Sequence, residues 1–248
     1  MRRLALVVLG IAAFLVLLVA LAPASFVVEQ FHRGEGVELS DVRGTFWNGA
    51  ARARVKLPAG ALDIEELSWH FAPERLLAGR IAFDVAAHDA RFDAQAQLGR
   101  RIGGIELRDL QAGGDAAVLG AALPLLATWR PEGRVTLAAP LLTFDEREVR
   151  GNARAEWRGA VLSFPDSRAL GTYVAQIRGD GGPMKVTLAT TEGLLRLSGE
   201  GTYTPPARFA LRGEARAQPA ATDTLEPLLT LLGPRRADGA RSFELRAP

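Results

Sequence analysis

Hydrophobic and polar side chains alternate through most of the chain after residue 40, and this pattern restricts the fold more than any other feature. In Ala51–Leu57 the odd positions are apolar and the even positions are basic, and Phe92–Leu98 alternates in a similar way. A repeat of two residues gives one buried and one solvated face, as in strands of an antiparallel sheet. The sequence therefore predicts a mainly β protein.

The C-terminal half adds turn sequences between the expected strands. Gly179–Gly182 and Thr191–Gly193 each separate two alternating stretches, and Pro205-Pro206 precedes another. Strands about ten residues apart that are joined by short turns are typical of a meander, in which each strand pairs with the next. We therefore expect an antiparallel meander sheet.

A few short segments favour helix. The clearest is Thr224–Leu232, which places four leucines on one side, with Thr222 or Asp223 as the expected cap and Gly233-Pro234 as the stop. Residues 116–127 are apolar and predict a second helix, interrupted near Pro124, and Pro73–Leu77 predicts a single turn. One or two short helices cannot cover a whole sheet.

One face of the C-terminal strands is therefore a candidate apolar groove. Its residues share a face of successive strands in the expected meander: Leu188, Leu195, Leu197, Phe209 and Leu211. A trough left open by the helix could take an acyl chain, because each buried methylene contributes about 0.8 kcal/mol. The alternative is closure by the N-terminal strands, which would give a dry core.

The stretch Gly44–Gly49, GTFWNG, is the second candidate site. Gly44 and Gly49 permit positive φ or close backbone approach, and Trp47 can bury a large ring at the edge of the sheet. This pattern favours a structural corner, with a ligand site as the alternative.

The sequence offers no chemistry of catalysis. Cysteine is absent, the three histidines have no metal-ligand spacing, and no serine lies in a GxSxG elbow. We expect no catalytic residue, no metal and no cofactor. The chain has 30 Lys and Arg residues and 28 Asp and Glu residues, and its sequence contains no basic block. A nucleic-acid partner is therefore not expected. The face carrying Arg52, Arg54 and Lys56 is interpreted as solvated, with anionic lipid heads or an acidic partner as the alternative.

An uncharged segment precedes the β-rich region. Residues 4–22 span about 28 Å as a helix, close to a bilayer core, and Arg2-Arg3 before it should stay cytoplasmic. The expected organisation is a cytoplasmic tip at 1–3, a transmembrane anchor at 4–22, a linker at 23–40 and a periplasmic β-rich domain at 41–248. A signal peptide cleaved around Ala22-Pro23-Ala24 is the alternative.

Several stretches, in order along nearly the whole chain, resemble the type II secretion system protein N family. They are the short tip and apolar anchor, LAPASFVV at 21–28, LSDVRGTFWNG at 39–49, LSWHFAPERLLAGR at 67–80, LGTY at 170–173 and LEPLLTLLGPRRADG at 225–239. Residues 100–160 match only in their general strand pattern. Within these stretches Gly44, Trp47, Gly49 and Trp69 are the motif residues, to which the resemblance assigns a structural role.

The resemblance implies a single-pass protein of the cell inner membrane with a periplasmic domain. It implies an accessory subunit, not an enzyme, in the machine that moves folded periplasmic proteins across the outer membrane. The expected partners are the C, L and M inner-membrane subunits and the secretin. The family is also similar to AsmA-like proteins, which implies a curved or open-barrel sheet and, as an alternative function, lipid binding or lipid handling.

Overall fold

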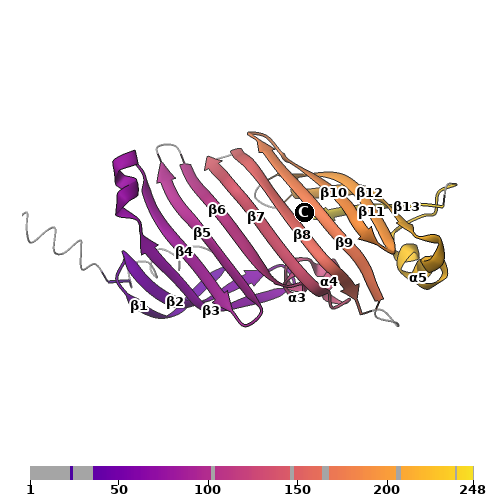
Figure 1. Ribbon diagram of the computed structural model, residues 1–248, viewed down its shortest axis with the longest axis horizontal. Helices are drawn as coiled ribbons and strands as arrows, with labels where there is room; N and C mark the ends of the chain where they lie inside the picture. Colours follow the sequence, from indigo (N-terminus) through magenta and orange to yellow (C-terminus); the bar gives the residue numbers. More distant parts are fainter. Residues whose placement is uncertain are drawn as a thin grey trace, which may run out of the picture.

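A computed structural model of the chain describes residues 23–24, 36–101, 104–145, 148–163, 168–204, 208–237 and 239–247. The expected tip and anchor lie outside these residues. Thirteen strands form one antiparallel sheet in which each strand is hydrogen-bonded to its neighbours in sequence (Figure 1). The strands are β1 (Val37–Gly44), β2 (Asn48–Leu57), β3 (Gly60–Phe71), β4 (Ile81–Asp89), β5 (Phe92–Arg101), β6 (Gly104–Asp115), β7 (Glu132–Asp145), β8 (Glu148–Leu162), β9 (Arg168–Asp180), β10 (Met184–Gly193), β11 (Leu195–Thr204), β12 (Arg208–Ala217) and β13 (Arg241–Ala247).

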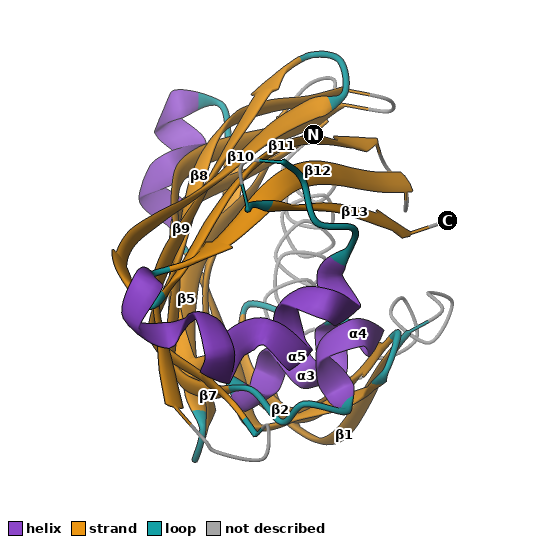
Figure 2. Cartoon of the chain, turned by 90° about the vertical axis from the view of Figure 1, so that its right-hand side faces the viewer, coloured by secondary structure: helices purple, strands orange, loops and turns teal. Residues whose placement is uncertain are grey.

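The sheet curves round without closing. Its strand order leaves β1 and β13 at the two edges, and Figure 2 shows α3 (Ala117–Ala122), α4 (Pro124–Ala127) and α5 (Thr222–Leu232) on the concave side of the resulting arch. The predicted mainly β fold with an antiparallel meander sheet is confirmed, and the described residues form a few short helices where one or two were expected. β1 begins at Val37, ahead of the boundary at residue 40 that the alternation indicated.

The helices are short and connect neighbouring strands. They are η1 (Pro73–Ala78) between β3 and β4, α3 (Ala117–Ala122) and α4 (Pro124–Ala127) between β6 and β7, and η2 (Pro219–Ala221) and α5 (Thr222–Leu232) between β12 and β13. The predicted break near Pro124 is confirmed. The predicted cap of the last helix is wrong, because Ala221 is its N-cap and no side chain caps it. Thr222 is already helical, and its hydroxyl donates to the carbonyl oxygen of Gln218.

Two β-bulges contribute to the curvature of the sheet. At Asp41 in β1 and at Asp109 in β6 the strand has one residue more than its partner, and both residues have positive φ, 51° and 49°. A bulge bends its strand and increases the local twist. The extra residue also shifts the alternation of side chains by one position. Leu107 and Leu110, which are three positions apart in β6, therefore point to the same face and pack in one cluster.

The core consists of three clusters along the apolar face of the sheet. One lies under α5 and includes Leu195, Leu211 and Phe243. The second surrounds Trp69 at the N-terminal strands, and the third surrounds Leu142 in the middle of the sheet. The opposite, outer face carries charged and polar side chains. The apolar face therefore positions the candidate groove described below.

Candidate functional site

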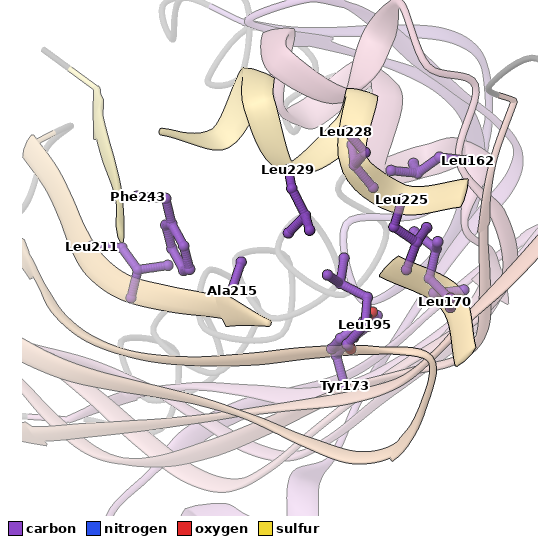
Figure 3. Close-up of a cluster of buried hydrophobic side chains, with 12 residues drawn as sticks. Leu162, Leu170, Tyr173, Leu195, Leu211, Ala215, Leu225, Leu228, Leu229 and Phe243 are labelled. Carbon is purple, nitrogen blue, oxygen red and sulfur yellow. Dashed lines mark hydrogen bonds between the residues drawn. The ribbon is translucent and has the colours of Figure 1, made fainter. Parts of the chain in front are cut away.

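The structure places all five residues of the predicted groove together on the apolar face. Leu195 and Leu211 are buried, while Leu188, Leu197 and Phe209 are partly buried and pack against the same cluster. Leu225, Leu228 and Leu229 of α5 point into this cluster from above the sheet (Figure 3). The helix therefore covers the groove at its Leu195–Leu211 portion.

The covered part of the groove is lined by apolar side chains. The hydroxyl of Tyr173 donates a 3.0 Å hydrogen bond to the carbonyl oxygen of Leu195, and both residues are buried. Burial raises the pKa of the Tyr173 phenol, because the charged form would lose its hydration. This region packs against apolar groups.

The two ends of the strands differ in their covering. α3, α4, η2 and α5 all connect strands at one end of the sheet, which we call the helical end. There the backbone N–H of Ala59, in the β2–β3 turn, donates to the carbonyl oxygen of Ala121 in α3 at 2.9 Å. η1 lies at the opposite ends of the strands, on the left in Figure 1, and we call this the η1 end.

At the η1 end the apolar face has an uncovered row of side chains. Cross-strand pairing aligns Ile81 with Arg100, Arg100 with Ile105 and Ile105 with Phe144, so that these four residues run across β4 to β7. Direct partners share a face of the sheet. The exposed fractions are 50% for Ile81, 46% for Ile105 and 39% for Phe144, with Leu98 beside them at 41%. Sequence reasoning missed this uncovered row, because it depends on the register of three hairpins.

The GTFWNG stretch forms an aromatic corner at the same end. Gly44 has a φ of 88°, and a side chain on Gly49 would place its Cβ 2.5 Å from the Trp69 ring. The Trp47 ring lies 5.0 Å from Phe46 and 4.7 Å from the ring of Phe71, centroid to centroid. Trp47 is half-buried, whereas Trp69 is buried. The structure thus places the four motif residues in one packed turn and the strand beneath it.

The outer face carries matched charges. Arg52, Arg54 and Lys56 form ion pairs with Asp41, Asp63 and Glu38 on the neighbouring strands, at 3.4, 2.6 and 2.7 Å. The hydrogen bond from Arg54 lowers the pKa of Asp63. Because each cation faces a carboxylate, this surface is a mixed-charge face and not a basic patch.

Shallow hollows on the outer face offer no reaction centre. One of them, of about 710 Å³, is lined by residues that include His88, Asp93 and Gln111. Its titratable pair is His88 and Asp93, which are hydrogen-bonded, and this bond raises the pKa of His88. Among the residues that the structure describes, no three His, Asp or Glu side chains gather as metal ligands.

Comparison with known families gives one match. Residues 35–244 match the family model of the type II secretion system (T2SS), protein N. No curated protein and no solved structure matches the chain. Within the described ranges, no helix has the length and apolar character needed to cross a membrane.

Proposed function

Because the chain belongs to the type II secretion system protein N family, we propose that it is an accessory inner-membrane subunit of that machinery. Family membership implies a role in type II secretion and makes the chain a structural secretion component. The family match is the main support for this proposal, because the matched region begins before β1 and ends within β13. The whole sheet, and not one motif, is the unit that the family shares.

Residues 4–22 anchor this subunit in the inner membrane, with residues 1–3 in the cytoplasm and the β-rich domain in the periplasm. The uncharged segment and the preceding Arg2-Arg3 support this topology. Alkaline phosphatase fused after Pro248 should be active, and a cytoplasmic reporter at the same position should be inactive. The opposite pair of results would contradict the topology. A mature chain lacking residues 1–24 would support a cleaved signal peptide instead.

The partners are the C, L and M inner-membrane subunits and the secretin. Deleting the gene in the source bacterium should leave type II substrates in the periplasm, and the full chain supplied in trans should restore their export. Photo-crosslinkers on the outer face, for example at Thr187, should capture one of these subunits. Normal export by the deletion strain, together with no crosslink to any subunit, would overturn the proposal.

A second candidate function is lipid binding, and the uncovered row of Ile81, Ile105 and Phe144 favours it. The test is native mass spectrometry of the full chain purified in mild detergent, followed by lipid extraction. Bound phospholipid should be lost in Leu98→Glu, which places a charge beside the uncovered row. It should be retained in Gln95→Glu, which changes the outer face of the same strand. A folded wild-type chain that carries no lipid, and accepts none from vesicles, would exclude this function.

A further inference from the structure

We propose that the η1 end of the sheet rests on the membrane surface, with Leu76 and Leu77 inserted among the lipids. This inference rests on the anchoring proposed above and does not depend on the secretion partners. Its occupant is a phospholipid bilayer. The observations that carry it are two exposed leucines, the uncovered row and the point where the chain joins the sheet.

The two leucines are the first observation. Leu77 is 94% exposed and Leu76 is 50% exposed, although both are large apolar residues in a short 3-10 turn. Among the exposed large hydrophobic residues that the structure describes, Leu77 has the highest exposed fraction. No buried residue lies within η1, so this turn contributes no side chain to the core. Its leucines are therefore available to a surface outside the chain.

The uncovered row provides the second observation. Ile81 begins β4, which follows η1 through Gly79 and Arg80, and Arg100 lies between Ile81 and Ile105 in the row. Arginine can lay its aliphatic stem along apolar surface while its guanidinium reaches phosphate groups. Apolar, aromatic and basic side chains mixed in this way are typical of the boundary between acyl chains and headgroups.

The third observation is the entry of the chain. Pro23 forms a β-bridge with Thr45, and the backbone N–H of Ala24 donates to the carbonyl oxygen of Gly44 at 3.3 Å. Thr45 lies in the β1–β2 turn, which is at the η1 end. The uncharged segment at 4–22 ends one residue before Pro23. An anchor that reaches the sheet at this point brings the η1 end, and not the helical end, to the bilayer.

The test uses the absence of cysteine from the chain, because one introduced cysteine then carries a unique label. Full-length Leu77→Cys, labelled with an environment-sensitive fluorophore, is reconstituted into vesicles of phosphatidylethanolamine and phosphatidylglycerol. Some of these lipids carry a quencher on their acyl chains. The matched control is Leu231→Cys, whose leucine is 62% exposed on α5 at the helical end. Both positions are exposed, so neither substitution disturbs the core.

We expect blue-shifted emission and strong quenching for the label at position 77, with neither change at position 231. A label at 77 that stays unquenched overturns the proposal. A blue shift without quenching also overturns it, because the leucines would then be covered by a second copy or by residues 1–22 and not by lipid. Equal quenching at both positions also overturns it. Washing the vesicles with alkaline carbonate separates two failures. If the chain is retained but its label is unquenched, only the proposal that the η1 end faces the membrane is contradicted. If the chain is washed off, the proposed anchoring is contradicted as well.

Discussion

Trp69 and Phe46 are joined by a hydrogen bond that ties the third strand to the turn between the first two. The indole Nε1–H of Trp69 donates to the carbonyl oxygen of Phe46 at 3.0 Å. The ring lies directly beneath Gly49, where no side chain intervenes. The aromatic corner therefore requires a glycine at position 49 as well as the two tryptophans. A substitution of this glycine is its first test.

Gly49→Ala should destabilise the protein by about 1–3 kcal/mol, because the new Cβ forces the Trp69 ring to move. The measurement is chemical denaturation of the full chain in detergent, followed by tryptophan fluorescence. Gly182→Ala is the matched control, since a Cβ there has no atom within 4 Å. Equal midpoints for the two variants would show that the corner has room for a methyl group.

Trp47→Ala tests whether the corner is structural or a binding site. Removal of a buried large aromatic side chain costs about 3–5 kcal/mol, and the half-buried Trp47 should approach the lower part of that range. Trp69→Ala should cost more, because that ring is buried and its hydrogen bond is also lost. An unchanged denaturation midpoint in Trp47→Ala, with loss of binding to a partner subunit, would identify Trp47 as a contact residue.

The face of α5 that covers the groove can be tested with two leucines of the same helix. Leu228 is 4% exposed in the cluster under α5, whereas Leu231 is 62% exposed. Leu228→Ala should lower the free energy of unfolding by about 2–5 kcal/mol, and Leu231→Ala by less than about 0.5 kcal/mol. Similar losses in both variants would mean that α5 packs through a different face.

Tyr173→Phe should reduce stability by about 1 kcal/mol at neutral pH, because it removes the hydrogen bond to Leu195. Burial raises the pKa of Tyr173 from its ordinary value of 10.0. The neutral phenol therefore contributes its full stability below pH 10. Above that pH the unfolded chain ionises first, so wild type loses stability as pH rises. The difference in denaturation midpoint between wild type and Tyr173→Phe should shrink as the pH is raised from 8 to 11. A constant difference would contradict a buried, neutral Tyr173.

The alternation of side chains was enough to predict the strands and their meander order, because each hairpin is a local event. Register was harder to predict. The bulges at Asp41 and Asp109 each insert one residue, so a count of odd and even positions fails beyond them. The uncovered row depends on such registers, since Ile81 and Phe144 come together only through β5 and β6. The helix cap was missed because the turn Pro219–Ala221 leads straight into α5 and makes Thr222 helical.

The five groove residues share one face because they lie on consecutive strands with regular pairing from β10 to β12. Their covering could not be read from the sequence. α5 packs on Leu195 and Leu211, and a helix of its length could equally have crossed another part of the sheet.

Strict neighbour-to-neighbour order has a consequence for how such a chain assembles. Each strand after β1 needs only the strand before it as a template. The entropy lost on closing each connection stays small, and contacts remain local in sequence. A polypeptide delivered across a membrane from one end can therefore build its sheet during delivery, one hairpin at a time. At each stage the growing edge belongs to the newest strand, and the next segment to arrive is its partner.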